Sequence, residues 1–328
     1  MNSKTFRVGL LTFLAFALVF ASGASAAEPL RVATGGPNGT YCAFAKEIAA
    51  AAKGQGLDIE VLNTAGSMEN IKLLKTGKAD VAFVQSDVLG FLLQTEKNAA
   101  REFKVIFPLY NEEVQILANN KIQSISDFKG KRIVTGSQRS GSWLTVSNII
   151  FQLAIPTVNK ITDMDPDDAV IAVLTGRADA MVYVGGRPTP LFTKLEKMAQ
   201  DPKQCKLLQK VHMLPVDDSK LLSAYYTQST LGPSDYSWMS SQIPTLAVKA
   251  YMIRFDPQYN ASEVRANPKD QQISQLIKVV RDNIETWKKS GHDKWKQVDI
   301  DAKLLAPWER EPLLMNDVQV EDLKDIFK

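Results

Sequence analysis

Two parts of the chain, about a hundred residues apart, carry the same residue pattern, and this duplication narrows the possible folds most. Residues 31–41 read Arg-Val-Ala-Thr-Gly-Gly-Pro-Asn-Gly-Thr-Tyr, and residues 132–143 read Arg-Ile-Val-Thr-Gly-Ser-Gln-Arg-Ser-Gly-Ser-Trp, with one residue inserted. Downstream of each, residues 74–84 and 174–184 share a Thr-Gly-(Lys/Arg)-Ala-Asp turn followed by an apolar run. Two repeated patterns in the same order predict two related α/β lobes.

The periodicity within each repeat predicts strands that alternate with helices. For the first lobe we expect strands 30–34, 58–63, 80–84 and 104–109 and helices 40–53, 67–76 and 87–95. For the second we expect strands 132–135 and 179–184 and helices 142–154, 167–175 and 188–199. Such alternation predicts parallel sheets with right-handed crossovers.

Two further apolar runs, residues 114–118 and 245–253, bracket the second lobe and are predicted to cross between the lobes. Residues 270–290 have apolar side chains at helical spacing, so we expect an amphipathic helix that returns to the first lobe. The predicted division is 1–26 signal peptide, 27–113 with 250–328 as lobe one, and 114–249 as lobe two. A hinge is expected at the two crossings. No structure is predicted for the tail from Gly291.

The N-terminus has the layout of a secretory signal peptide. Lys4 and Arg7 precede an apolar run over residues 8–20, and Ala24-Ser25-Ala26 forms a small-residue cleavage site. The alternative is an uncleaved anchor, but the run is short for a membrane span. We expect cleavage after Ala26 and a periplasmic mature chain.

Composition excludes several classes of protein. The 39 Lys and Arg against 36 Asp and Glu give a net charge of +3, with no basic block suited to nucleic acid. Two Cys and two His are too few for a zinc framework or a disulfide scaffold. We therefore expect no metal and no cofactor, and we expect Cys42 and Cys205, in different lobes, to be free thiols.

Enzyme motifs are also missing from the sequence. Residues 35–39 do not form the dinucleotide-binding glycine pattern, and the loop at 136–142 lacks the lysine of a phosphate-binding loop. There is no serine-hydrolase or zinc-protease motif. His212 and His292 lie outside the loops that could form a cleft, so the chain is predicted not to be an enzyme.

Four polar loops follow predicted strands, where ligands bind in parallel α/β sheets: residues 34–41, 66–70, 85–87 and 136–143. Helix N-termini there favour an anion, and Arg139 and Arg187 could add carboxylate contacts. Tyr41 and Trp143 are predicted to wall the cleft, with Trp143 contacting the apolar part of the ligand. The alternative to a binding role is a purely structural one: the same residues could be N-caps, tight turns, core aromatics or surface charges. The candidate ligand-binding residues are Thr34, Gly36, Asn38, Gly39, Tyr41, Ser67, Asn70, Gln85, Ser86, Ser137, Arg139, Ser140, Gly141, Ser142, Trp143, Gly185 and Arg187.

Taken together, these motifs resemble the TAXI family of solute-binding subunits of TRAP transporters, over residues 30–288. The resemblance implies a two-lobed type II periplasmic-binding-protein fold with a ligand cleft between the lobes. It also implies a monomer that captures a small organic anion, such as glutamate or a related carboxylate, for a TRAP permease. The motifs that carry it are Thr34-Gly-Gly-x-x-Gly-x-Tyr41, Gly66-Ser-x-Glu-Asn70, Gly77-x-Ala-Asp80, Gln85-Ser-Asp87, Asp127-Phe-Lys-Gly-Lys-Arg132, Ser140-Gly141 and Val184-Gly-Gly-x-Pro188.

The chain departs from that family in places. Arg139 stands where the family commonly has Gly or Pro, Arg187 occupies a variable position, and the family's C-terminal His-Pro-Gly-Ala segment is missing. The extra arginines suit a ligand with more negative charge. Two alternatives stay open from the sequence: a ligand-binding receptor for a sensor kinase, and an ABC-type substrate-binding protein.

Overall fold

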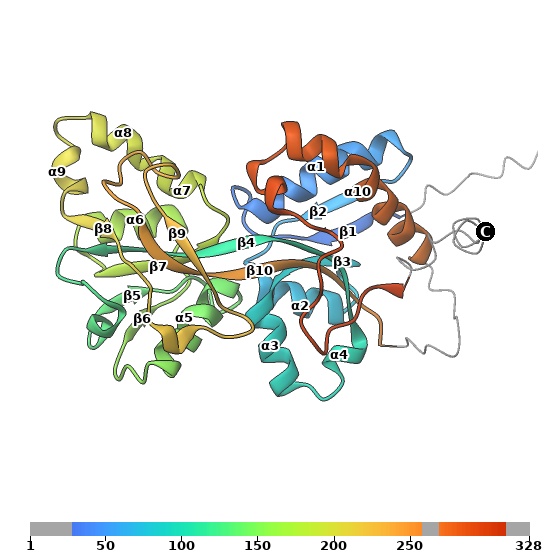
Figure 1. The fold of residues 1–328 in the computed structure, drawn as a ribbon, viewed down its shortest axis with the longest axis horizontal. Coiled ribbons are helices and arrows are strands. Elements are labelled where there is room, and N and C mark those ends of the chain that lie inside the picture. Colours follow the sequence, from blue (N-terminus) through green and yellow to red (C-terminus); the bar gives the residue numbers. More distant parts are fainter. Residues whose placement is uncertain (1–27, 258–268, 313–328) are drawn as a thin grey trace, which may run out of the picture.

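The computed structural model describes residues 28–257 and 269–312, so the predicted signal peptide lies outside the described residues. Two α/β lobes lie side by side along the long axis of the molecule, and two long strands run from one to the other (Figure 1). The two-lobed α/β architecture predicted from the internal duplication is therefore confirmed.

The first lobe is built mainly from the N-terminal part of the chain. Its elements follow the predicted order closely: β1 (Leu30–Ala33), α1 (Thr40–Gly54), β2 (Ile59–Leu62), α2 (Ser67–Lys75), β3 (Val81–Gln85), α3 (Ser86–Thr95) and α4 (Ala99–Glu102). All five residues of β3 are buried, as expected for a strand covered on both faces.

The second lobe begins with the short 3-10 helix η1 (Ile125–Phe128). Its other elements are β5 (Arg132–Val134), α5 (Gly141–Gln152), β6 (Asn159–Ile161), α6 (Pro166–Leu174), β7 (Ala180–Gly185), α7 (Pro190–Thr193), α8 (Leu195–Gln200), α9 (Cys205–Leu208), β8 (Val211–Met213), η2 (Ser219–Leu221) and β9 (Thr227–Leu231). The single helix predicted over 188–199 is wrong. Thr189 instead caps a new helix at Pro190, accepting a hydrogen bond from Leu191 N–H, and α8 is a separate helix.

One sheet runs through both lobes in the order β2-β1-β3-β10-β4-β7-β5-β6, with β8 on β4 and β9 on β10. Within each lobe the outer strands pair in parallel, as predicted: β1 with β2 and β3, and β5 with β6 and β7. The prediction of purely parallel sheets is wrong at the centre. There β4 (Phe103–Asn119) and β10 (Ile243–Phe255) pair antiparallel with each other and with β7 and β3.

The two predicted crossings are long strands of this sheet. Strand β4 joins the predicted strand 104–109 and the predicted crossing 114–118 into one element of 17 residues. Glu112 lies opposite Val248 and Glu113 opposite Ala247, and the register shifts between Lys249 and Tyr251. The expected boundaries between residues 113 and 114 and between 249 and 250 thus fall inside paired strands.

The duplication extends to matching ion pairs. Arg31 at the start of β1 donates through Nε and Nη2 to Asp80, at 3.1 and 2.8 Å, and Arg132 at the start of β5 binds Asp179 in the same two-pronged way, both at 3.1 Å. In each lobe the helix that comes before this aspartate ends next to a glycine with positive φ. The glycine is Gly77 (+63°) after α2 and Gly176 (+74°) after α6. Both therefore use the left-handed C-terminal cap that the sequence predicts.

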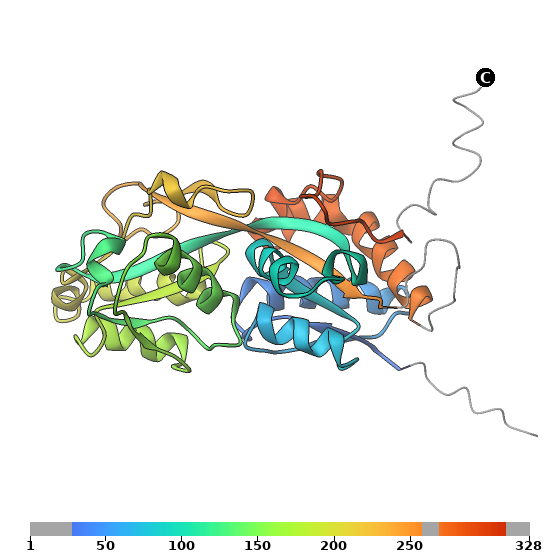
Figure 2. The same cartoon turned by 90° about the horizontal axis from the view of Figure 1, so that it is seen from below.

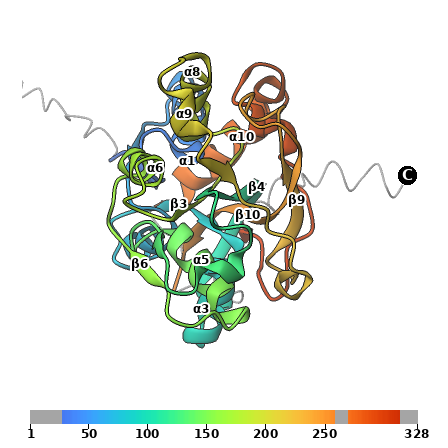
Figure 3. The same ribbon diagram turned by 90° about the vertical axis from the view of Figure 1, so that its left-hand side faces the viewer.

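Helices cover both faces of the sheet (Figures 2 and 3). In lobe one, α1 and α10 (Asp270–Ser290) bury their apolar sides on one face, and α2 and α3 on the other. In lobe two, α5 packs on one face and α6 and α7 on the other. Helix α10 confirms the predicted amphipathic helix that returns to lobe one.

The segment after α10, for which the sequence predicts no structure, closes the core of lobe one. In the 3-10 helix η3 (Asp293–Gln297), Trp295 is fully buried. Its ring stacks on Phe44 and Trp287, with centroid distances of 3.9 and 4.6 Å, and its Nε1 donates to Glu47. The packing is between side chains far apart in sequence, so local periodicity does not show it.

Replacing Trp295 with alanine is expected to lower the free energy of unfolding by about 3–5 kcal/mol, because it opens a large cavity in the core. Phe151→Ala, at a side chain that is 84% exposed, should change it by less than about 0.5 kcal/mol. Urea denaturation of both variants measures this. Equal effects would mean that η3 is not part of the core.

Candidate functional site

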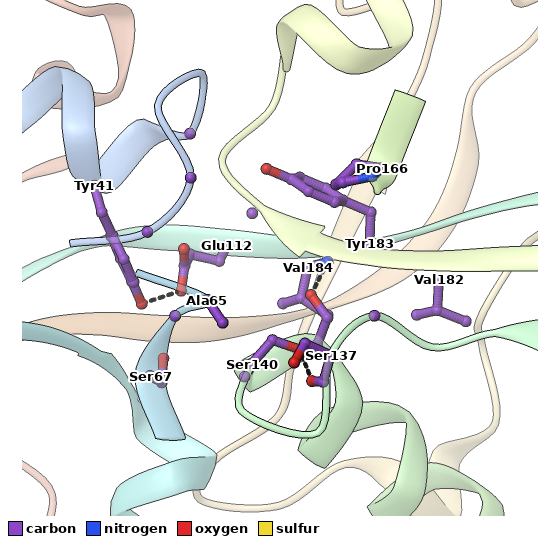
Figure 4. A pocket seen from close by; sticks show the side chains of 18 of the residues that line it. Tyr41, Ala65, Ser67, Glu112, Ser137, Ser140, Pro166, Val182, Tyr183 and Val184 are labelled. Atoms are coloured by element: carbon purple, nitrogen blue, oxygen red, sulfur yellow. Dashed lines mark hydrogen bonds between the residues drawn. The ribbon is translucent and has the colours of Figure 1, made fainter. Parts of the chain in front are cut away.

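A cavity of about 260 Å³ lies between the lobes, where the segments after β1, β2, β5 and β6 meet the ends of β3 and β7. Figure 4 shows side chains from both lobes around it, with Tyr41 and Ser67 on one side and Ser137, Ser140 and Tyr183 on the other. The duplication explains the placement, because equivalent strand ends of both lobes face this space.

On the lobe-one side, a glycine turn leads from β1 into α1. Gly39 N–H donates to Gly36 O at 2.9 Å, and a Cβ on Gly39 would lie 3.2 Å from that oxygen. The helix has no side-chain cap at Gly39. The N–H groups of its first turn have no partner within the helix and are suited to a ligand oxygen.

On the lobe-two side, Ser140 caps α5. Its hydroxyl accepts from Trp143 N–H at 3.2 Å and donates to Ser137 O at 2.6 Å. Ser142 Oγ accepts from Val184 N–H at 3.0 Å, which ties the loop to β7. The loop is therefore held rigidly against the cavity.

The lobes touch at Gly141. A Cβ there would lie 1.3 Å from Gln85 Oε1 and 3.0 Å from Ser67 Oγ, both in lobe one. Close by, Glu69 N–H donates to Arg139 O across the gap at 2.9 Å. Glycine at this position allows the two helix N-termini to approach over the cavity.

A buried acid also joins the lobes. Asp87 on α3 accepts hydrogen bonds from the hydroxyls of Thr145 (2.6 Å) and Tyr226 (2.9 Å), both in lobe two. Burial raises the pKa of Asp87. Because all three groups are withdrawn from water here, these hydrogen bonds stabilise the contact between the lobes.

The only acidic side chain lining the cavity, among the described residues, is Glu112 of β4. It is 4% exposed, and Tyr41 donates a hydrogen bond to its Oε2 at 2.7 Å (Figure 4). Burial raises its pKa to about 8, although the hydrogen bond from Tyr41 opposes the shift. No lysine or arginine of the described chain lines the cavity.

Gln85, at the end of β3, also lines the cavity and is 3% exposed. Neither its amide nitrogen nor its amide oxygen has a hydrogen-bond partner within the described residues. An unpaired buried amide costs free energy, so these two atoms are available to a ligand with both donors and acceptors.

Ten of the seventeen predicted site residues line this cavity. They come from all four predicted loops and from the end of β7: Gly36, Gly39, Tyr41, Ser67, Gln85, Ser137, Ser140, Gly141, Ser142 and Gly185.

Three predicted residues form internal hydrogen bonds instead. Thr34 Oγ1 donates to Leu62 O at 2.8 Å. Asn70 Nδ2 donates to Thr34 O and Phe83 O at 2.6 and 2.7 Å. Ser86 Oγ accepts from Lys249 N–H at 3.0 Å. Their polar side chains hold the strand ends in place and do not line the cavity.

Four more predicted residues also lie off the cavity lining. Arg139 is 64% exposed and pairs with Glu69 at 2.9 Å. Arg187 pairs with Asp235 at 2.6 Å and lies 3.4 Å from Glu113.

The other two are Trp143 and Asn38. Trp143 packs against the apolar cluster of α2 and α3, and Asn38 is exposed in its turn. Arg139 and Arg187 thus form ion pairs with carboxylates of the chain, and Trp143 packs against other side chains instead of a ligand.

The sequence analysis missed Glu112, Tyr183 and the apolar lining from the second lobe. The missed apolar residues are Val134, Met164, Pro166, Ala169, Met181, Val182 and Val184. Glu112 sits in a strand interior, and the available signal was the polar stretch Asn111-Glu112-Glu113 within an otherwise mostly apolar strand. Tyr183 and the apolar residues have no sequence signal that distinguishes them from ordinary core residues.

Within the described residues, no group of three or more His, Cys, Asp or Glu side chains is placed to hold a metal ion. No helix in the same part of the chain is long and apolar enough to cross a membrane.

Comparison with known proteins gives one family match, to the model described as the NMT1-like family, over residues 32–306. This match overturns the resemblance to the TAXI family, and delivery to a TRAP permease, which rested on that resemblance, goes with it. Most of the motifs behind that resemblance are short glycine and serine turns, which suit a turn or a helix N-terminus in many folds.

Several solved structures are similar at low sequence identity. The GluR0 ligand-binding core from Nostoc punctiforme in complex with L-glutamate is 17% identical, covering 80% of this chain and 98% of that one, with a TM-score of 0.45. A putative L-cystine ABC transporter from Listeria monocytogenes is 14% identical over 79% and 91%, with a TM-score of 0.48. An amino acid ABC transporter substrate-binding protein from Streptococcus pneumoniae, bound to L-arginine, is 12% identical over 82% and 95%, with a TM-score of 0.46. The predicted two-lobed α/β fold with a cleft between the lobes is confirmed by the structure itself (Figure 1).

The pKa of Glu112 predicts a pH-dependent stability. A carboxyl whose pKa rises from about 4.3 in the unfolded chain to about 8 in the native protein favours folding fully below pH 4.3. That contribution is lost as the pH rises to 8. The Glu112→Gln variant has no carboxyl to ionise, so its free energy of unfolding lacks this loss. Relative to the native protein, that free energy should increase by about 1 kcal/mol per pH unit between pH 5 and 8.

Urea denaturation at pH 5, 6, 7 and 8 measures the difference. Glu60→Gln removes the same charge from an exposed position of β2 and should run parallel to the native protein. Parallel curves for Glu112→Gln as well would show that Glu112 is ionised in the native protein throughout this range.

Proposed function

The chain belongs to the NMT1-like family, and we propose that it is an extracytoplasmic solute-binding protein that captures a small organic acid between its lobes for a membrane permease. One observation carries the proposal: a polar-rimmed cavity of about 260 Å³ between two lobes that touch over it. A volume of this size suits a small metabolite and not a polymer.

The acid group of the ligand is met by main-chain donors. Helices α1, α2 and α5 all begin at the cavity, through Thr40, Ser67 and Gly141. Their first-turn N–H groups and aligned dipoles favour a carboxylate without a basic side chain. The expected anchoring by Arg139 or Arg187 is not part of the proposal, because both arginines already pair with carboxylates.

The rest of the lining is apolar and comes mainly from lobe two, including Met164, Met181 and Val182. This surface contributes shape selectivity, which charge recognition alone does not supply. The ligand we propose therefore has a carboxylate and a short carbon skeleton.

The partner we propose is an ABC-type permease, one of the two alternatives to a TRAP permease that the sequence leaves open; the other is a sensor kinase. The signal-peptide layout of residues 1–26 supports export of the chain. Neither His212 nor His292 lines the cavity, which supports binding without catalysis. We keep the lobe division at residues 113/114 and 249/250, with the hinge in β4 and β10.

Mass spectrometry of the ligand released from mildly purified protein tests the proposal. It is followed by calorimetry with a panel of amino, hydroxy, oxo and dicarboxylic acids. We expect one or a few small acids to bind without turnover, and small-angle scattering to show a smaller radius of gyration with ligand than without. Chemical conversion of the bound acid, or no binding of any acid, would contradict it.

The contact of Asp87 with Thr145 predicts how lobe closure affects affinity. Thr145→Val keeps the side-chain shape but removes the hydroxyl that donates to Asp87 at 2.6 Å. Losing this bond costs the closed state about 1 kcal/mol, so ligand binding should weaken roughly five-fold. Thr145→Ser keeps the hydroxyl and should bind like the native protein. If calorimetry finds both variants unchanged, the contact does not contribute to capture.

A further inference from the structure

Glu112 is a buried carboxyl that the binding of a ligand carboxylate does not use. It lies at the cavity with one hydrogen bond, from Tyr41 to Oε2. Its second oxygen, Oε1, makes no hydrogen bond to the part of the chain that the structure describes. A carboxyl kept from water in this way is costly when ionised, unless a positive group reaches it.

The protein's own charges do not supply that positive group. The nearest lysine that acts on Glu112 is Lys294 of η3, and its Nζ contacts both oxygens of Glu113, at 3.0 and 2.8 Å, and Asn111 O at 2.8 Å. Its donors are therefore already engaged. Arg187 pairs with Asp235 and Glu113.

The remaining titratable groups near Glu112 are acids or phenols. None of those named here is a cation that could pair with the ionised carboxyl. Glu113 on the same strand and Asp87 on α3 are acids. Tyr110 on β4 and Tyr183 on β7 are phenols whose pKa values Glu112 and burial raise. On the neighbouring strand β10, Lys249 lies opposite Asn111, whereas Val248 lies opposite Glu112. Because side chains alternate along a strand, the Lys249 side chain is on the other face of the sheet from Glu112.

We propose that Glu112 selects the ligand by receiving a protonated amine, so that the captured acid carries both an amine and a carboxylate. The inference rests on the proposed function and refines it. The two ends of such a ligand match the two kinds of group at the cavity. The helix N-termini and serine hydroxyls donate to the carboxylate, while Glu112 accepts from the amine. The unpartnered amide of Gln85 can serve either end, through its nitrogen or its oxygen.

A simple carboxylate would leave this arrangement unbalanced. Donors are already plentiful, since the hydroxyls of Ser67, Ser137 and Ser142 line the same cavity as the helix N-termini. A second acid beside a ligand carboxylate adds repulsion if it is ionised. An amine removes the problem, because its positive charge pairs with the buried carboxyl.

Capture should then release a proton. In the ligand-free cavity burial keeps the pKa of Glu112 at about 8, so at pH 7 it holds about 0.9 proton. The amine lowers that pKa, and the proton passes to the buffer as Glu112 becomes a carboxylate. Because the bound state holds fewer protons, affinity should rise about ten-fold per pH unit from pH 6 to near pH 8.

The experiment compares matched pairs of acids by calorimetry on the full mature chain. Each of a set of L-amino acids is paired with the 2-hydroxy acid of the same skeleton, and each titration is run at pH 7 in phosphate and in Tris. We expect an amino acid to bind at least ten-fold more tightly than its hydroxy partner. The buffer dependence should show release of about 0.9 proton.

Glu112→Gln should weaken binding of that amino acid about 10- to 100-fold and abolish both the proton release and the pH slope. Glu60→Gln is the control that removes one negative charge away from the cavity, and it should keep all three. Since proton release is measured on the native protein, the test holds even if the glutamine variant is poorly folded.

The outcomes separate the two proposals. Equal binding of amino and hydroxy acids, or tight binding of an amino acid with no proton release, overturns the role of Glu112 and leaves the solute-binding function standing. Failure of every acid of both series to bind overturns the proposed function itself.

Discussion

The antiparallel pairing of β4 with β10 is the constraint on which the rest of the structure depends. Among the described residues, these two strands carry the sheet from one lobe to the other, so lobe one is completed only when the chain returns from lobe two through β10. The same strands place Glu112 at the junction. A side chain there borders the cleft yet is shielded by both lobes, and this position explains why its acid is so strongly desolvated.

The duplicated lobes bring the same kind of surface to both sides of the cleft. In each, an arginine at the start of a strand binds an aspartate after a glycine cap, which fixes the strand beside the loop that leads to a helix N-terminus. Gly141 then lets these loops touch, since any side chain there would collide with Gln85. The loops at the cavity thus meet through main chain and small residues, while Arg139 and Arg187 nearby pair with carboxylates of the chain.

The sequence was informative where structure follows from local pattern. Repeats, glycine caps and apolar periodicity predicted most helices and strands of both lobes, and loops after strands predicted ten residues of the cavity lining. It failed where distant residues decide. The pairing of Arg139 with Glu69 and of Arg187 with Asp235 joins parts of the chain 70 and 48 residues apart, and no local signal distinguishes a paired arginine from a free one. Glu112 was overlooked because a charged residue within a mostly apolar strand can have several roles. Only the cavity beside it, which the sequence does not show, indicates that it faces a ligand site.

The distribution of charge around the cleft suggests how such a site achieves selectivity. Placing arginines in the cavity would hold any anion tightly, whatever the rest of its structure. Here both arginines pair with carboxylates of the chain, helix N-termini face the cavity without a basic side chain beside them, and Glu112 lies inside with no ion pair among the described residues. A ligand without a positive group leaves that acid protonated and gains from it at most a hydrogen bond, not an ion pair. A ligand with one receives a charge-assisted bond in a site shielded from water, where such bonds are strongest. Selectivity then comes from a buried group that the folded protein leaves unpaired.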